Sequence, residues 1–472
     1  MNTKQLSALA LLPLVACGGQ QASETPSPAE KNNLLFLLID DLRPELGCYG
    51  NSEVLTPNID ALAASGTQFQ RAYSNIPVSG ASRASLLTGL RPKEGRFISY
   101  YAEIDKDAPE VPTIGELFKN NGLTTHSNGK VVHHASTDAL RSWTEQWMPH
   151  VKIDYQWENY LTNTEYNPKV RYFTECLDVP DSAYYDGKTT LKAIADLRKF
   201  KESGERFFLA VGLLKPHLPF NAPKKYWDMY DSTKITLPAT DEMDRSGFPA
   251  NAFHNWGEIR SYTDVSWTEP CLPHDQAIRM IHGYRACVSY TDAQVGLILD
   301  ELKALGLDKN TTVVLIGDHG WSLGDHGEWC KHSNFEKTSH VPTMIAGPGI
   351  PVGKKIDLVT ESIDLYPTFC DLVGVAVPEH CQGNSLMPLI NGNEEGWDNT
   401  ALIQWNNGRY GRTLITQTHE YTEWRDKEGE VIEQMLFDHQ ADPEEVNNIA
   451  SDNKALCDEM SADLQARFAK VN

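Results

Sequence analysis

Three short runs of apolar residues are typical of β-strands that are buried on both faces. They span residues 34–39, 207–211 and 313–316 and contain almost only aliphatic and aromatic side chains. An unbroken apolar run, unlike an alternating one, indicates a strand with helices packed on both sides of its sheet. We therefore expect these three segments to lie inside one sheet.

Helical segments separate these strands. Residues 56–69 are predicted to form a helix, with Pro57 suited to its first turn. Residues 284–305 carry an apolar helical face, and Gly306 suits the end of that helix; the face consists of Val288, Val295, Leu299 and Leu302. Strands that alternate with helices predict an α/β fold with a large, mostly parallel central sheet flanked by helices.

Polar residues follow each predicted strand. They are, in chain order, Asp40 and Asp41, Lys215 and His217, and Asp318 and His319. Because open α/β sheets bind their ligands at the carboxyl ends of the strands, these residues predict a functional site at one sheet edge. Acidic residues that only cap helices are the alternative, and three such segments in one chain favour a site.

The pattern changes after Trp397. Residues 413–415 and 421–424 are short alternating runs, and residues 454–468 form an amphipathic stretch that predicts a helix. We expect a large domain over residues 33–395 and a smaller C-terminal α+β subdomain over residues 396–472.

The N-terminus resembles an export signal. Lys4 precedes the apolar run 6–15, which is too short to span a membrane, and residues 14–17 resemble the bacterial lipobox that ends in an acylated Cys17. Residues 1–17 are then a lipoprotein signal peptide and residues 18–32 a tether. Gly18 favours the outer membrane, so we expect an exported lipoprotein, periplasmic or on the cell surface, that meets the membrane only through its lipid. An ordinary signal peptide that ends near a cysteine is the alternative.

An exported chain can form disulfides. Eight cysteines remain after Cys17, and Cys370 and Cys381 bracket a short loop that makes them the best candidates for a bridge. Cys48 and Cys287 could equally be buried thiols.

The net charge restricts the ligands. The chain has 42 basic and 64 acidic residues and a formal charge of -22. This balance excludes nucleic acid as a partner and repels polyanions at long range. A site for an anionic ligand must therefore be a local cluster of basic side chains and metal.

Residues 78–89, which read Val-Ser-Gly-Ala-Ser-Arg-Ala-Ser-Leu-Leu-Thr-Gly, resemble the signature of the type I sulfatase family. The resemblance implies that Ser79 is oxidised to formylglycine (3-oxoalanine). Ser79 and Ala81 replace the commoner cysteine and proline, which implies a serine-type enzyme that a radical formylglycine-generating maturase activates. Taken alone, the segment could be a small-residue loop that enters a helix at Ser82.

The chemistry explains why serine alone would be inadequate. A serine that attacks a sulfate ester would leave a stable sulfate ester on the enzyme, whereas the hydrated aldehyde has a second hydroxyl through which it can expel sulfate.

The resemblance also implies a metal site. Asp40, Asp41, Asp318 and His319 match the ligands of the family, and the oxygen of residue 79 completes the set. Carboxylate oxygens suit a hard cation, so Ca²⁺ is expected first and Mg²⁺ second.

Basic residues that match the family supply the missing positive charge. In the family pattern, Lys130 holds the formylglycine oxygens and His133 acts as a base, with His134 as an adjacent competitor. The pattern makes His217 the general acid for the leaving alcohol, since histidine can supply a proton near neutral pH. The complete set expected to act in catalysis or substrate binding is Ser79, Arg83, Lys130, His133, Lys215, His217 and Lys331.

Residues 318–331 and 40–50 look most like the iduronate-2-sulfatase branch, and the resemblance runs from residue 33 to about 450. It implies an alkaline-phosphatase-like fold. Trp321 either stacks on a sugar face or belongs to the core.

The expected activity is removal of sulfate from a sulfated sugar or polysaccharide. A uronate-2-sulfate-like unit is favoured, in a glycosaminoglycan or an algal glycan such as ulvan or carrageenan. Two alternatives stay open: a phosphatase or phosphodiesterase that uses unmodified Ser79, and a non-catalytic lipoprotein that binds sulfated glycans. The sequence leaves the oligomeric state open.

Overall fold

The computed structural model describes residues 32–149, 161, 171–268, 271–406 and 408–471. The predicted signal peptide, Cys17 and all but the last residue of the tether lie outside these residues. Within the described chain, no helix combines the length and the apolar character needed to cross a membrane.

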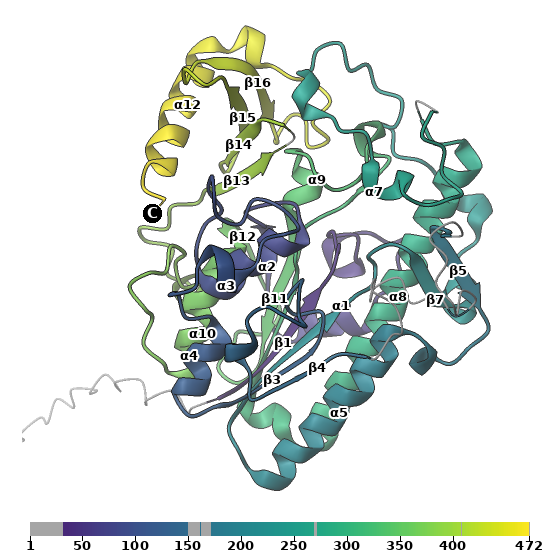
Figure 1. Ribbon diagram of the computed structural model, residues 1–472, viewed down its shortest axis with the longest axis vertical. Helices are drawn as coiled ribbons and strands as arrows, with labels where there is room; N and C mark the ends of the chain where they lie inside the picture. The colour runs from purple at the N-terminus through teal and green to yellow at the C-terminus, as the bar shows by residue number, and fades with distance from the viewer. Residues whose placement is uncertain (1–31, 150–160, 162–170, 269–270, 407, 472) are drawn as a thin grey trace, which may run out of the picture.

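An eight-stranded sheet forms the centre of the fold (Figure 1). Its strands, in spatial order, are β12 (Lys354–Glu361), β2 (Thr67–Tyr73), β11 (His340–Ala346), β8 (Thr311–Gly317), β1 (Asn33–Ile39), β6 (Phe207–Leu213), β3 (Thr124–Gly129) and β4 (Glu145–Trp147). Only β11 runs antiparallel to its neighbours among the pairs described. The three predicted strands are adjacent, because β1 pairs with both β6 and β8. The prediction of a mostly parallel central sheet is confirmed.

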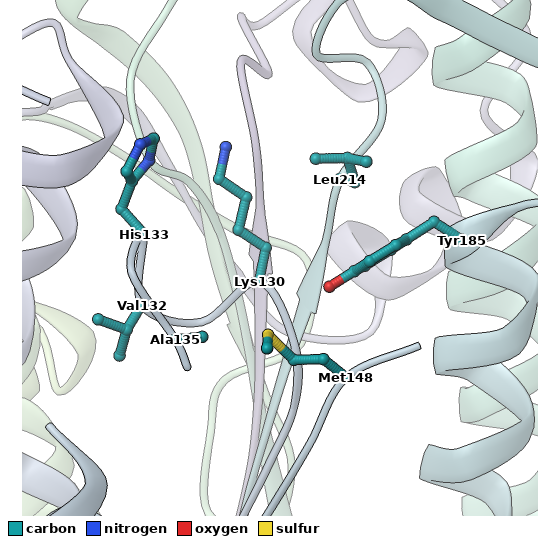
Figure 2. Close-up of a pocket in the computed structure, with 7 residues that line it drawn as sticks. All are labelled: Lys130, Val132, His133, Ala135, Met148, Tyr185 and Leu214. Atoms are coloured by element: carbon teal, nitrogen blue, oxygen red, sulfur yellow. The ribbon is translucent and has the colours of Figure 1, made fainter. Parts of the chain in front are cut away.

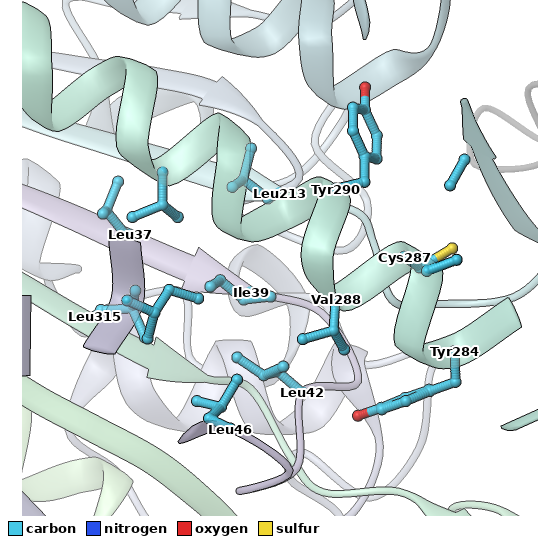
Figure 3. Packing of buried hydrophobic residues seen from close by; sticks show 14 of the residues in the cluster. Leu37, Ile39, Leu42, Leu46, Leu213, Tyr284, Cys287, Val288, Tyr290 and Leu315 are labelled. Atoms are coloured by element: carbon cyan, nitrogen blue, oxygen red, sulfur yellow. The ribbon is translucent and has the colours of Figure 1, made fainter. Parts of the chain in front are cut away.

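Helices cover both faces of this sheet, as the unbroken apolar strands require. Leu35, Leu37 and Ile39 of β1 pack in one core cluster with α1 (Pro57–Ala64), α5 (Tyr185–Ser203) and α8 (His274–Ala304). Figure 3 shows part of this cluster, with Leu37 and Ile39 facing the side chains of α8. The alternate residues of β1 pack on the opposite face with α2 (Ser79–Thr88), α4 (Ile114–Asn120) and α10 (Leu365–Val373).

The predicted helix over residues 56–69 is partly wrong. Pro57 lies in the first turn of α1, but this helix ends at Ala64 and β2 begins at Thr67. Gly66 lies between them against β11, where a Cβ atom would come within 2.2 Å of the Ile345 carbonyl oxygen. The close approach of the two backbones ends the helix, and the following residues extend the sheet. The predicted helix over 284–305 is confirmed, although α8 begins ten residues earlier, at His274.

A smaller antiparallel sheet follows the central one. Its strands are β13 (Ala401–Asn406), β14 (Tyr410–Ile415), β15 (His419–Arg425) and β16 (Val431–Asp438), and α12 (Lys454–Phe468) packs on it (Figure 1). The α+β character of the C-terminal part is confirmed, and α12 has the predicted bounds. The boundary between residues 395 and 396 stays a prediction.

The other elements are short. They are α3 (Ile104–Asp107), α6 (Lys224–Trp227), α7 (Gly257–Arg260), α9 (Glu336–Ser339), α11 (Met387–Ile390), β5 (Thr174–Leu177), β7 (Phe220–Pro223), β9 (Ser322–Leu323) and β10 (Trp329–Cys330).

The expected bridge between Cys370 and Cys381 is absent. All eight cysteines in the described part of the chain are unbonded thiols. Cys370 lies in α10 and belongs to the core, and burial raises its pKa to about 12. Cys381 is half-buried and packs close to Gly89 at the end of α2. These thiols therefore contribute packing rather than a covalent link.

Candidate active site

The residues that follow β1, β6 and β8 meet at one edge of the central sheet. Ile39, the last residue of β1, pairs with Leu213 of β6 and with Gly317 of β8, so the three strands end at the same level. The backbone N–H of Asp41 donates to Asp318 Oδ1 at 3.0 Å, which ties two of these ends together. The polar residues that follow the three strands thus lie together at the carboxyl edge of the sheet, as predicted.

Four buried side chains at this edge can hold a metal ion. Asp40, Asp41, Asp318 and His319 each offer one ligand atom, and these atoms lie within 4.8 Å of one another. The Ser79 hydroxyl lies 3.0 Å from both Asp40 Oδ1 and His319 Nε2, so its oxygen belongs to the same group. All five predicted ligands are thus brought together.

Two features of this group suit a cation. Burial lowers the pKa of His319 to about 4, and its Nδ1 hydrogen-bonds the Gly320 carbonyl, which leaves the Nε2 lone pair facing the carboxylates. Burial raises the pKa of Asp41 well above its usual value, and its Oδ2 atom is buried without a hydrogen-bond partner in the described chain. A divalent cation would satisfy that oxygen, and three carboxylates with one imidazole fit a hard metal such as Ca²⁺ or Mg²⁺.

Helix α2 presents the motif that contains Ser79. Ser79 is the first residue of the helix, and Gly80 lies against the Tyr100 backbone, where a Cβ atom would come within 2.4 Å of the carbonyl oxygen. Only glycine fits at that position. The N-terminal end of a helix also favours negative charge on an adjacent oxygen.

Arg83 lies one helical turn after Ser79 and orients the carboxylates. Its Nε donates to Asp318 Oδ2 at 2.8 Å and its Nη2 to Asp40 Oδ1 at 3.0 Å, with the side chain fully buried. Burial alone would raise the pKa of Asp40, but Lys130 and Arg83 hold that pKa well below its usual value. Asp40 therefore stays ionised.

Lys130 and His133 come from the loop after β3. Figure 2 shows the Lys130 side chain rising between His133 and Tyr185, with its nitrogen directed away from Met148. The Lys130 ammonium donates to Asp40 Oδ2, and burial lowers the pKa of His133 well below its usual value. His133 is thus a neutral imidazole that can accept a proton.

His134 is turned away from the site. Its Nε2 hydrogen-bonds the Tyr100 carbonyl oxygen at 2.9 Å, and its side chain does not line the cavity described below. Of these two adjacent histidines, His133 is the one that lines the cavity with Ser79.

His217 and Lys331 line the same cavity as Ser79, together with a residue that the sequence did not indicate. Lys331 Nζ donates to Asp41 Oδ1 at 2.8 Å and lies 3.4 Å from Glu258 Oε1. His217 Nε2 lies 3.3 Å from the same Glu258 oxygen. Glu258 comes from the short helix α7, outside every recognised motif, and only the folded chain brings it here.

Two predicted substrate-binding residues have structural positions instead. Lys215 is buried, and its ammonium donates to the carbonyl oxygens of His217 and Pro219, which fixes the loop that carries His217. Trp321 has 0% of its surface exposed, and Lys331 Nζ lies 5.2 Å from the centre of its ring. Trp321 therefore packs near Lys331 in the core and cannot stack on a sugar. Both assignments to substrate contact are corrected.

A cavity of about 450 Å³ opens beside Ser79, His133, His217 and Lys331. This volume lies in the range of small-molecule sites. The side chains and backbone that line it belong to Val78, Ser79, Tyr100, His133, Arg171, His217, Gly257, Glu258, Ser261, Tyr262, Lys331 and His332.

Comparison with known proteins agrees with this geometry. Residues 32–375 match the family described as Sulfatase, and residues 324–472 match the family described as N-sulphoglucosamine sulphohydrolase, C-terminal. The chain is 36% identical to iduronate 2-sulfatase of Homo sapiens over 407 residues. This alignment covers 78% of this chain and 73% of that protein.

Solved structures share the fold. The phosphonate monoester hydrolase SpPMH from Silicibacter pomeroyi has a TM-score of 0.78 and 24% identity, covering 93% of this chain and 96% of that one. A 2-O GAG sulfatase has a TM-score of 0.70 and 23% identity, covering 94% of each chain. The family match spans the whole central sheet and its polar edge, and a relative is identical at 36% of the aligned positions. This chain therefore belongs to the sulfatase family and is a sulfuric ester hydrolase.

Proposed function

We propose that this sulfatase removes sulfate from a sugar unit of a sulfated glycan, with formylglycine made from Ser79 as its reactive group. The observation that carries the proposal is the position of Ser79. Its hydroxyl lies 3.0 Å from two of the four metal-binding side chains and lines the same cavity as His133, His217 and Lys331.

The surroundings of residue 79 fit the modified side chain. Its hydrated aldehyde would supply the attacking oxygen and a second hydroxyl for sulfate release. Asp40 and His319 already contact the oxygen at this position, and the Lys130 ammonium beside Asp40 supplies positive charge. Asp40, Asp41, Asp318 and His319 would hold the metal, which supplies Lewis-acid polarisation when bound.

His217 would protonate the leaving oxygen. In the free protein, burial and then Lys331 hold the pKa of His217 well below its usual value. A bound sulfate ester would bring negative charge next to this imidazole and favour its protonated form. Lys331 would face the same anion, because it lines the same cavity.

His133 has the opposite task. Its imidazole is neutral and lines the cavity with Ser79, so it can accept a proton from the oxygen of residue 79 when sulfate leaves. Two histidines on different loops would thus divide the acid and base roles.

A uronate-2-sulfate-like unit is the first candidate substrate. The relative named iduronate 2-sulfatase supports it, and the cavity of about 450 Å³ is large enough for one or two sugar units. Glycosaminoglycans and algal glycans such as ulvan and carrageenan contain suitable sulfate esters.

Release of free sulfate tests the proposal. The chain is produced with and without a radical maturase and incubated with oligosaccharides of heparan, dermatan, ulvan and carrageenan. We expect sulfate release only from the co-produced enzyme, and fastest from a substrate with a terminal 2-O-sulfated uronate. An enzyme that releases sulfate equally well without the maturase, or that cleaves phosphate esters instead, would contradict the proposal.

We also propose that the chain is an exported lipoprotein anchored through Cys17. Labelling of cells with a palmitate analogue should mark the wild-type chain and leave Cys17→Ser unmarked. A wild-type chain that takes up no label would show that residues 1–17 are an ordinary signal peptide.

A further inference from the structure

Glu258 is a carboxylate inside the substrate cavity that the proposed chemistry leaves without a role. It lines the cavity with Ser79, His217 and Lys331, and its side chain is 20% exposed. Its second oxygen, Oε2, is buried and has no hydrogen-bond partner in the described part of the chain. A carboxylate normally accepts several hydrogen bonds, so Glu258 has acceptor capacity to spare.

Glu258 interacts with the two cationic groups that are expected to bind sulfate. Its Oε1 lies 3.3 Å from His217 Nε2 and 3.4 Å from Lys331 Nζ. In the free protein this carboxylate therefore takes the place of an anion between His217 and Lys331.

Substrate binding changes these contacts. When a sulfate ester draws Lys331 and His217 to itself, Glu258 loses part of its pairing while it stays in a largely enclosed cavity. A carboxylate without donors in such a place is costly, and a substrate with a hydroxyl group can supply the missing donor. A sugar carries suitable donors, because its ring hydroxyls lie on the carbon atoms next to the sulfate ester.

We propose that Glu258 determines specificity by accepting a hydrogen bond from a free hydroxyl group next to the sulfate ester. The same negative charge excludes a second sulfate or a carboxylate from that position. The substrate is then a unit with one sulfate and a neighbouring free hydroxyl, and vicinally disulfated units are rejected. This inference rests on the proposed sulfatase reaction at Ser79.

Three aryl sulfates test the idea without knowledge of the glycan. They are phenyl sulfate, 2-hydroxyphenyl sulfate and the bis-sulfate of catechol, which place hydrogen, hydroxyl or sulfate next to the ester. Initial rates of sulfate release give kcat/KM for each compound with mature enzyme at pH 7, where the phenolic hydroxyl is neutral.

In the wild type we expect 2-hydroxyphenyl sulfate to be favoured over phenyl sulfate, and the bis-sulfate to be disfavoured. Glu258→Ala removes the acceptor and should lower the preference for the hydroxyl compound by about tenfold. Glu258→Gln keeps an acceptor but removes the charge. It should improve the bis-sulfate relative to phenyl sulfate by about tenfold and largely keep the hydroxyl preference.

Glu242→Gln is the matched control, since Glu242 is exposed and lies outside the cavity lining. Two ratios of kcat/KM are compared: 2-hydroxyphenyl sulfate to phenyl sulfate, and the bis-sulfate to phenyl sulfate. Glu242→Gln should leave both ratios at their wild-type values. Because each ratio compares two substrates in one preparation, partial loss of folded protein does not change it. If both Glu258 variants lose activity equally on all three compounds, Glu258 only holds Lys331 and His217 in place, and the inference is wrong. If the mature wild type releases no sulfate from these compounds or from the glycan oligosaccharides, the proposed function itself fails.

Discussion

Ser79 combines three features that a nucleophile position needs: burial, contact with the metal-binding side chains, and access to the cavity. Ser79→Ala should lower sulfate release by at least about 10³-fold, because no oxygen remains at that position. The unfolding temperature should stay within a few degrees of the wild type, since a buried hydroxyl is replaced by a smaller apolar group. Substantial activity in Ser79→Ala would remove this residue from the reaction.

His217 should matter most for poor leaving groups. Sugar alcohols need a proton as they leave, whereas nitrophenolate does not, so His217→Gln should lower kcat/KM by about 10²- to 10⁴-fold on a sulfated sugar. The loss on nitrophenyl sulfate should be about tenfold or less. Equal losses on the two substrates would show that His217 binds sulfate without transferring a proton.

The sequence could predict those residues whose role depends on local motifs. Asp40, Asp41, Asp318 and His319 directly follow buried strands, and strand ends meet at a sheet edge in any such fold. Glu258 could not be found in this way, because its place depends on how the segment before α8 folds back over the site. Trp321 and Lys215 follow strand ends too, but neither lines the cavity, and the local sequence does not specify the packing that keeps them out of it.

At the scale of elements, continuous apolar runs identified β1, β6 and β8 because a strand buried on both faces has few other compositions. The edge of the sheet was harder to predict. Strand β2 has half-buried as well as buried residues and follows α1 closely, so a single helical pattern covered both elements. Its partners β11 and β12 are more than 250 residues away in the sequence, and such pairing leaves no local signal.

Strand β15 carries a buried carboxyl group that should make stability depend on pH. Glu420 is fully buried beside Glu445 and His439, and burial followed by Glu445 raises its pKa well above the usual value. The folded protein therefore retains a proton that the unfolded chain releases above about pH 4.5. It follows that this group makes stability fall as pH rises from about 5 toward the folded pKa.

Glu420→Gln should remove this dependence. Urea unfolding gives the free energy of unfolding of both proteins at pH 5 and at pH 8. From pH 5 to pH 8, this free energy should rise by about 1 kcal/mol in the variant relative to the wild type. Comparing the two proteins at each pH cancels the titration of other groups. If the difference in free energy of unfolding between variant and wild type is the same at both pH values, Glu420 is ionised in the folded protein.

For the whole molecule, the formal charge of -22 contrasts with the basic residues gathered at the sheet edge. This contrast was predictable from the sequence. The net negative charge of the chain repels an anion, and the family motifs supply basic side chains at one place. The unbonded state of Cys370 and Cys381 was not predictable, because spacing in a sequence does not fix the geometry that a disulfide needs.

Metal removal should destabilise the protein. Three carboxylates lie together in the buried group, so a chelator should lower the unfolding temperature by several degrees, and added Ca²⁺ should restore it better than Mg²⁺. Asp318→Asn, which loses one ligand charge, should respond much less to the chelator. An unfolding temperature unaffected by chelator and by either ion would argue against a metal at Asp40, Asp41, Asp318 and His319.

The mass of one peptide tests the central claim most directly. Trypsin releases residues 72–83, which contain Ser79, and this peptide is to be weighed in preparations whose sulfate release has been measured. The account predicts a peptide lighter by two hydrogen atoms, in an amount that rises in proportion to activity. A fully active enzyme whose peptide has the mass of unmodified serine would contradict it.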